Sequence, residues 1–220
     1  IFCEEGISKT AAKDTVVVDT STIDPASTRS IAKRLFKIGI RYLDSPILGR
    51  PSAVGNWLLP TGGDIEALEY AKPVLRTFAK DAISVGESGC GSALKLLNQM
   101  MFSTINAITA EVMAIAKRVG ISDRVFYETI AKSNAATVSG LFKEAARNII
   151  EQNFDHPIFT VDLLIKDTKL ALEMAKEAGS PPIITGVVQI FNEIAAANGF
   201  GNQDSSALYK VYNNHYRGGV

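Results

Sequence analysis

The segment Glu87–Met100, with the sequence ESGCGSALKLLNQM, places a lysine, two side-chain amides and two glycines close together. Lys95 is followed by Asn98 and Gln99, three and four residues later, so all three would share one face of a helix. A lysine held in this way can exchange a proton with a substrate hydroxyl, and the amides can bind a substrate oxygen. Glycines next to a lysine can instead bind a phosphate, so the segment has two possible chemistries.

The spacing of the glycines excludes a phosphate-binding loop. The P-loop pattern places Gly, Lys and Ser or Thr in succession, whereas Gly91 and Lys95 are separated here and a leucine follows the lysine. A dinucleotide-binding fingerprint needs a third glycine three residues after the second, and Leu94 occupies that position. The segment fits better as a tight turn that leads into a helix, with Ser88 or Ser92 as the predicted N-cap.

A helical position leaves two interpretations of Lys95 open. The positive end of the helix dipole favours a neutral, proton-accepting amine in the first turns, and burial favours it further. The alternative is a surface lysine on an amphipathic helix. The segment by itself does not decide between them.

The elements around this segment predict an α/β region followed by an all-α region. Before residue 87, β-branched and apolar runs that are typical of strands alternate with helical patterns. After it, helical periodicity dominates and begins with one long, buried helix that ends at Gly120. We therefore expect the second half of a Rossmann-like parallel-sheet domain over residues 1–87 and an all-helical domain over residues 88–220. The expected strands are 15–19, 40–47, 55–63 and 82–86, and the expected helices between them are 24–39 and 64–80, the latter interrupted at Pro73.

Composition excludes several classes of partner. The 220 residues hold 23 Lys and Arg against 23 Asp and Glu, which is not the charge balance of a nucleic-acid or acidic-membrane binder. No window reads as long and apolar enough to span a bilayer. The two cysteines and two histidines lack metal-ligand spacing, so no metal site is expected. The chain begins without methionine and reads like the middle of a domain, so we expect further residues upstream.

Four segments carry a resemblance to a known family: VVVDTSTIDP, LDSPILGRPSAVGNWLLPTGG, GCGSALKLLNQM and FTVDLLIKDTKLALEMAKEAG. In this order, and over essentially all 220 residues, they resemble the β-hydroxyacid dehydrogenases. That group contains 3-hydroxyisobutyrate dehydrogenase, tartronate semialdehyde reductase and, more distantly, 6-phosphogluconate dehydrogenase. The resemblance implies metal-independent hydride exchange between NAD or NADP and a small β-hydroxyacid or semialdehyde acid. It also implies a glycine fingerprint upstream of Ile1.

The resemblance gives Lys95 a specific role. A lysine of such enzymes acts as general base on the hydroxyl during oxidation, or as general acid during reduction, and Lys95 occupies its position. Asn98 and Gln99 match residues that orient the substrate. The family usually has Asn where Gln99 stands, so the amide chemistry is kept with one more methylene.

The family's Ser-Gly-Gly turn, which holds the substrate carboxylate, corresponds to Leu48, Gly49 and Arg50. Leu48 removes a hydroxyl donor and Arg50 adds a cation. Arg50 either forms a bidentate pair with a carboxylate or points to solvent, and both remain open.

Other matches concern the cofactor and the substrate cleft. Thr22 matches a position beside the nicotinamide, although a turn residue next to a helix cap would look the same. Lys166 and Asp167 match a Lys-Asp pair whose lysine reaches the cofactor; the alternative is a solvated charge pair. Phe159 matches an aromatic residue that lines the substrate cleft, and the alternative is a core position.

Two functions of different classes follow. The first is a cytoplasmic NAD(P)-dependent enzyme for a small-molecule substrate, a homodimer or homotetramer with no nucleic-acid or membrane partner; a transit peptide upstream would place it in the mitochondrial matrix. The second is a non-catalytic member or fragment of the fold that acts as an oligomerisation or ligand-binding module, which Leu48, Arg50 and Gln99 favour. An imine reductase-like relative would share the fold but replace the lysine, so Lys95 argues against it. The residue that distinguishes NAD from NADP is expected upstream.

Overall fold

The computed structural model describes residues 1–133 and 135–214, without the side chains of 213 and 214. The chain forms two compact units, Ile1–Asn98 and Gln99–Val220. The division falls inside the long helix α4 (Cys90–Arg118). The domain boundary between residues 87 and 88 stays a prediction.

The first unit contains a four-stranded sheet in the order β1-β2-β3-β4. Its elements after the short helix α1 (Ile7–Thr10) are β1 (Val16–Asp19), α2 (Pro25–Phe36), β2 (Arg41–Asp44), the 3-10 turn η1 (Pro51–Ala53), β3 (Leu58–Gly62), α3 (Ile65–Leu75) and β4 (Asp81–Gly86). The β1–β2 and β3–β4 pairs are parallel, as predicted, whereas β2–β3 is antiparallel. The reversal has a physical reason: a helix crosses over within each parallel pair, but only η1 lies between β2 and β3.

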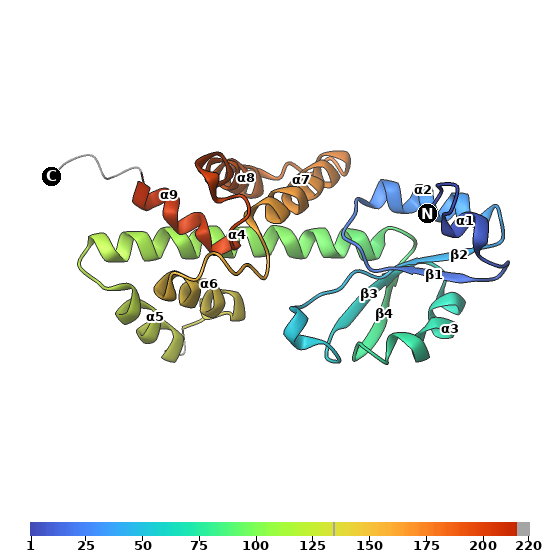
Figure 1. Cartoon of the computed structure of the whole chain (residues 1–220), viewed down its shortest axis with the longest axis horizontal. Coiled ribbons are helices and arrows are strands. Elements are labelled where there is room, and N and C mark those ends of the chain that lie inside the picture. Colours follow the sequence, from blue (N-terminus) through green and yellow to red (C-terminus); the bar gives the residue numbers. More distant parts are fainter. Residues whose placement is uncertain (134, 215–220) are drawn as a thin grey trace. The chain divides into compact units, whose positions relative to one another are not determined.

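The reversal of strand direction also explains where the helices lie. Crossovers between parallel strands are right-handed, so a helix that follows an upward strand and one that follows a downward strand cover opposite faces. Figure 1 shows α2 and α3 on opposite sides of the sheet. The valines of β1 divide accordingly: Val17 packs in the cluster with Leu35 of α2, and Val16 and Val18 pack in the cluster with Leu68 of α3.

Local sequence signals set the ends of both helices. Asp24 caps α2 by accepting a hydrogen bond from the Ser27 N–H at 2.7 Å, and Asp64 caps α3 by accepting from the Ala67 N–H at 2.7 Å. Gly39 follows α2 with a φ of 77°, as its predicted place at the helix end requires. Pro73 does not interrupt α3, contrary to expectation, because it lies in the last turn and the helix ends two residues later.

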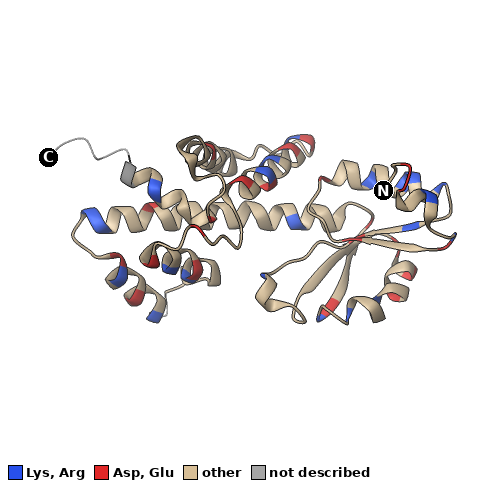
Figure 2. Ribbon diagram, in the orientation of Figure 1, with Lys and Arg blue, Asp and Glu red and all other residues tan. Residues whose placement is uncertain are grey.

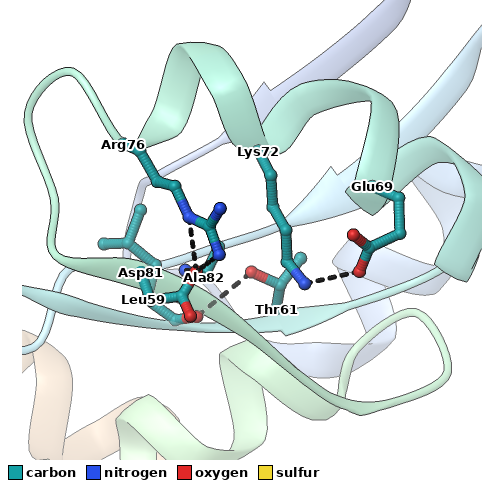
Figure 3. Close-up of polar contacts among 7 residues, drawn as sticks. All are labelled: Leu59, Thr61, Glu69, Lys72, Arg76, Asp81 and Ala82. Atoms are coloured by element: carbon teal, nitrogen blue, oxygen red, sulfur yellow. Dashed lines mark hydrogen bonds and ion pairs between the residues drawn. The ribbon is translucent and has the colours of Figure 1, made fainter.

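Exposed polar contacts tie α3 to the strand that follows it. Figure 3 shows the Arg76 side chain reaching Asp81 at the start of β4, where Nε donates to Oδ1 at 3.1 Å. Lys72 and Glu69 pair along the outer face of the same helix. Hydrogen bonding by Arg76, which outweighs the small effect of desolvation, holds the pKa of Asp81 below its ordinary value.

The second unit is helical, as predicted. After the larger part of α4 it contains α5 (Asp123–Lys132), α6 (Gly140–Glu151), α7 (Val161–Glu177), α8 (Ile183–Ala195), the π-helical turn η2 (Ala196–Phe200), the 3-10 turn η3 (Ser205–Leu208) and α9 (Tyr209–Asn214). Its core includes Met113, Ile149, Phe154 and Leu164, all nearly inaccessible to solvent. Figure 2 shows charged residues along α5, α6 and α7, whereas α8 is almost without them.

One helical stretch of the described residues, Ile183–Phe200, is long and apolar enough to cross a membrane by length and composition. The expectation that no window would qualify is therefore wrong by that criterion. A single such helix is weak evidence of a membrane span. Asn192 on this stretch is fully buried and donates to Ser103 Oγ of α4 at 3.0 Å, and Glu193 pairs with Lys169 of α7 at 3.1 Å. These polar contacts attach the stretch to the helical unit.

Candidate functional site

The helix that carries Lys95 is anchored at its N-terminus by the buried carboxylate of Asp44. Oδ1 accepts from the Gly89 N–H at 2.9 Å and Oδ2 accepts from the Ser92 N–H at 2.8 Å. Two of the N–H groups that a helix start leaves without a partner are thereby bound. The predicted cap at Ser88 or Ser92 is wrong, because the capping group comes from the end of β2; the Ser92 hydroxyl is instead hydrogen-bonded to Thr28 Oγ1 at 2.9 Å.

Two glycines permit this close approach. A Cβ atom at Gly91 would lie 2.3 Å from the carbonyl oxygen of Asp44 and 2.6 Å from that of Pro60. A Cβ atom at Gly62 would lie 2.7 Å from Asp44 Oδ1. Real Cβ atoms do not approach that closely, so both positions need glycine. Gly91 of the ESGCG segment thus serves packing at the start of α4.

Lys95 lies in the second turn of α4, half-buried, and its Nζ donates to the carbonyl oxygen of Ile47 at 2.9 Å. The side chain therefore runs back to the loop that follows β2. That loop also contains the predicted residues Leu48, Gly49 and Arg50. The first unit brings the lysine and this loop together.

The loop itself is attached to the start of β3. Leu48 forms an isolated antiparallel bridge with Leu58. The indole Nε1 of Trp57 donates to the carbonyl oxygen of Arg50 at 2.9 Å. Leu48 and Arg50 are half-buried and Gly49 is exposed.

Gln99 takes part in a buried polar cluster of the second unit. Its Nε2 donates to Asp167 Oδ2 at 2.7 Å, and Lys166 Nζ lies 2.9 Å from Asp167 Oδ1. Gln99 and Asp167 are both almost fully buried, whereas Lys166 and Asn98 are exposed. The Gln99 amide nitrogen is thus directed at Asp167, a contact that the sequence did not predict.

Phe159, predicted to line the substrate cleft, lies two residues before α7 and packs edge-to-face against Phe102, with ring centroids 5.4 Å apart. Phe102 follows Gln99 by three residues and Lys95 by seven, so the three lie along one side of α4.

Thr22 lies just after the carboxyl end of β1 and is half-buried. Nearby, Asp19 Oδ1 accepts from the Ser21 N–H at 2.8 Å and Oδ2 accepts from the Tyr42 hydroxyl at 2.8 Å. Burial alone would raise the pKa of Asp19, but the hydrogen bonds from Ser21 and Tyr42 outweigh it and keep this pKa below its ordinary value. Nucleotide ligands of α/β sheets bind at the carboxyl ends of parallel strands, so the hydroxyls after β1 suit part of a dinucleotide.

Comparison with known proteins decides the family. Residues 1–86 match the model described as the NAD binding domain of 6-phosphogluconate dehydrogenase. Residues 89–212 match the model described as NAD-binding of NADP-dependent 3-hydroxyisobutyrate dehydrogenase. The chain belongs to the 3-hydroxyisobutyrate dehydrogenase family.

Individual relatives agree with this family. An L-threonate dehydrogenase of Escherichia coli O6:H1 is 32% identical over 217 residues, which cover 96% of this chain and 70% of the relative. A 2-(hydroxymethyl)glutarate dehydrogenase of Eubacterium barkeri is also 32% identical, with 94% and 69% covered. A solved 3-hydroxyisobutyrate dehydrogenase from Salmonella typhimurium superposes with a TM-score of 0.87 at 27% identity, over 94% of this chain and 72% of that one. This family member is an oxidoreductase of the hydroxyacid dehydrogenase class that uses NAD or NADP.

Three residues of the site region were not identified from the sequence. Asp44 and Trp57 lie in the quoted segment LDSPILGRPSAVGNWLLPTGG, but the partners of Asp44 are 45 and 48 residues away, and Trp57 binds a loop carbonyl that no local pattern marks. Phe102 could have been found from its spacing, since it continues the series of Lys95 and Gln99 at one helical turn.

Proposed function

We propose that this family member catalyses metal-independent hydride exchange between NAD or NADP and a small β-hydroxyacid or semialdehyde acid, with Lys95 as the general acid/base. The observation that carries the proposal is the hydrogen bond from Lys95 Nζ to the carbonyl of Ile47 at 2.9 Å. It fixes a half-buried amine beside the loop that matches the family's substrate turn.

The bond to Ile47 suits a group that must change its protonation state. A charged lysine has three N–H donors, and a neutral one keeps two donors and gains a lone pair. The bond can therefore persist in both states while the lone pair accepts the proton of a substrate hydroxyl. Asp44 supports this geometry because it fixes the first turn of α4, which sets where the Lys95 side chain begins.

The remaining roles follow the chemistry of the side chains. Arg50 and the backbone of Gly49 would bind the substrate carboxylate, and Leu48 would replace the usual hydroxyl with an apolar contact. Asn98 and Gln99 would orient the substrate, Gln99 through Oε1 since its Nε2 is directed at Asp167. Phe159, against Phe102, would provide an apolar wall.

For the cofactor, Thr22 and the Lys166–Asp167 pair are the residues that would hold it. When bound, NAD or NADP supplies or accepts the hydride. A hydroxyl and an ammonium group match the amide and phosphate groups of a dinucleotide, and Asp167 fixes the Lys166 side chain at 2.9 Å. We further propose that the protein has no nucleic-acid partner, since positive and negative side chains balance, and that it is cytoplasmic.

Lys95→Ala in the full-length protein tests the central assignment. Turnover of L-threonate, 2-(hydroxymethyl)glutarate and 3-hydroxyisobutyrate should be measured with NAD and with NADP. We expect kcat to fall by about 10²- to 10⁴-fold, the usual contribution of general acid–base catalysis, with dinucleotide affinity retained. Lys117→Ala is the matched control, because this exposed lysine lies at the other end of the same helix. Retained turnover in Lys95→Ala would contradict the assignment.

A non-catalytic oligomerisation or ligand-binding module is the second candidate. The engagement of Gln99 with Asp167 at 2.7 Å favours it, because this amide is partly committed to a structural contact. In that case the wild-type protein would turn over none of the three hydroxyacids with either cofactor, while it would still self-associate or bind a hydroxyacid.

A further inference from the structure

We infer that Trp57 is a positioning residue for the substrate, one that holds Gly49 and Arg50 in the conformation that receives the substrate carboxylate. This inference rests on the proposed function, since it takes these two residues as carboxylate ligands. Trp57 would determine which hydroxyacids bind and how tightly they bind, without touching the reacting atoms.

The first observation is the hydrogen bond between the indole and the loop. Trp57 Nε1 donates to the carbonyl oxygen of Arg50 at 2.9 Å. An indole has one donor and no acceptor, so this bond fixes the direction of the ring edge. It also fixes the peptide plane between Arg50 and Pro51, and thus the position from which the Arg50 side chain extends.

The second observation is that Gly49 fits closely against the same ring. A Cβ atom on Gly49 would lie 2.6 Å from Trp57 Cδ1 and 2.9 Å from Nε1. Gly49 also has a φ of 141°, which side chains rarely adopt. The indole therefore occupies the space that any larger residue at position 49 would need, and the ring and the glycine determine each other's positions.

The third observation is that the tryptophan is itself held firmly. Its carbonyl oxygen accepts from the Lys80 N–H at 2.8 Å, just before β4. Its side chain packs against the cluster that contains Leu59 and Leu68. The neighbouring residue Leu58 forms the bridge to Leu48 on the loop. Trp57 thus connects the sheet core to residues 48–50.

These contacts lie on a different part of the loop from the lysine. Lys95 binds the carbonyl of Ile47, whereas Trp57 binds the carbonyl of Arg50, three residues later. Loosening the Trp57 contact should therefore weaken substrate binding more than proton transfer. That difference separates positioning of the carboxylate ligands from a general loss of structure.

Trp57→Phe in the full-length protein is the test, because it keeps an aromatic ring and removes the N–H donor. We expect KM for the hydroxyacid with the highest turnover among the three named above to rise about 2- to 13-fold, the ratio that corresponds to one hydrogen bond. The kcat should stay within about twofold and the dinucleotide affinity should not change. Tyr70→Phe is the control, since this exposed side chain of α3 also loses one polar group. An unchanged KM in Trp57→Phe, or an equal fall of kcat, would overturn the inference.

Fluorescence gives a readout that does not need turnover. Trp57 is the only tryptophan of the 220 residues, so the emission lost in Trp57→Phe reports on this ring. The same three hydroxyacids are titrated into the wild-type protein. We expect the tryptophan emission to change with the hydroxyacid that binds. If the wild type lacks turnover altogether, the proposed function fails and this titration alone decides: a hydroxyacid-dependent change supports the inference, and none overturns it.

A double-mutant cycle tests the contact itself. Gly49→Ala should be strongly unfavourable for hydroxyacid binding when the indole is present, and less so in a Trp57→Ala background, where the space is vacated. Additive effects of the two substitutions would contradict the contact. Thermal unfolding of each variant identifies any that do not fold, and the Trp57→Phe measurements then carry the test.

Discussion

Asp19 and Asp44 pair directly across the parallel strands β1 and β2, yet their carboxylates have different partners. Asp19 accepts from an N–H two residues away, in a turn that is readable from the local sequence. Asp44 accepts from N–H groups 45 and 48 residues away. A sequence read with local rules identifies the first kind of contact and misses the second. The caps at Asp24, Ser122 and Thr160 are of the first kind.

Asp19 makes the stability of the protein depend on pH. Its pKa lies below the ordinary value of 3.8, because hydrogen bonds from Ser21 and Tyr42 outweigh the effect of burial. A lowered pKa in the folded state stabilises the protein above the unfolded value, and this contribution is lost as the pH falls through the folded value. Asp19→Asn should therefore lower the free energy of unfolding at pH 7 and have a smaller effect near pH 3.

Urea denaturation of the wild type, Asp19→Asn and Tyr42→Phe at both pH values measures this dependence. Tyr42→Phe removes one of the hydrogen-bond donors to Asp19, so it should reproduce part of the same pattern. A difference between wild type and Asp19→Asn that stays constant or grows toward low pH would contradict the assignment.

At the scale of elements, periodicity and caps predicted the helices and strands well, but not how all the strands pair. The strands Val16–Asp19 and Asp81–Gly86, for example, were expected over residues 15–19 and 82–86 from their apolar runs. The antiparallel step from β2 to β3 depends instead on the conformation of residues 45–57, where η1 replaces a crossover helix. No periodic signal marks such a turn, because it is built from single contacts such as Trp57 with Arg50.

The start of α4 gives an element-scale prediction. Gly91→Ala would place a Cβ atom 2.3 Å from the carbonyl oxygen of Asp44, on rigid backbone, so the start of α4 must move away from β2. We expect a loss of about 1–3 kcal/mol in the free energy of unfolding, the usual cost of overpacking, or a protein that does not fold. Turnover should fall as well, because Lys95 moves with the helix.

Gly186→Ala is the matched control for this prediction. Gly186 also lies inside a helix, α8, but a Cβ atom there meets nothing within 4 Å. Alanine should therefore stabilise the protein by about 0.5–1 kcal/mol through its better helix propensity. Urea denaturation of both variants gives the comparison, and equal effects of the two substitutions would show that the close approach at Gly91 does not constrain the fold.

At the scale of the whole molecule, the family resemblance supplied functional roles that no local pattern contains. Lys95 in an isolated helix is consistent with a surface residue, and only its place in a long ordered series of motifs suggests catalysis. Physical contacts then add what the resemblance lacks. Gln99 and Arg50 are positions at which this chain departs from the family's usual pattern. The structure shows their partners: Gln99 binds Asp167, and the carbonyl of Arg50 binds Trp57.

Self-association is the prediction that belongs to this scale. Ile183, Val187, Ile190 and Ile194 repeat at intervals of four, three and four residues along α8, and each is at least 40% exposed. Glu193 is the only charged residue of this helix, which agrees with its mostly tan ribbon in Figure 2. Apolar stripes of this kind are covered in proteins that remain in solution. We therefore expect a homodimer or homotetramer in which α8 packs against a second copy.

Replacing both Val187 and Ile190 by glutamate should disrupt that assembly. Burial of two such side chains contributes about 3–6 kcal/mol, so the dissociation constant should rise roughly a hundredfold or more. Sedimentation velocity across a concentration series measures the change, with Lys143→Glu, at an exposed position of α6, as the control for added negative charge. Ile183–Phe200 also has the length and composition of a membrane span. Flotation with lipid vesicles should therefore be measured alongside sedimentation. A wild-type protein that is monomeric at all concentrations, or that floats with vesicles through this helix, would contradict the assembly, since the stripe would then have another partner.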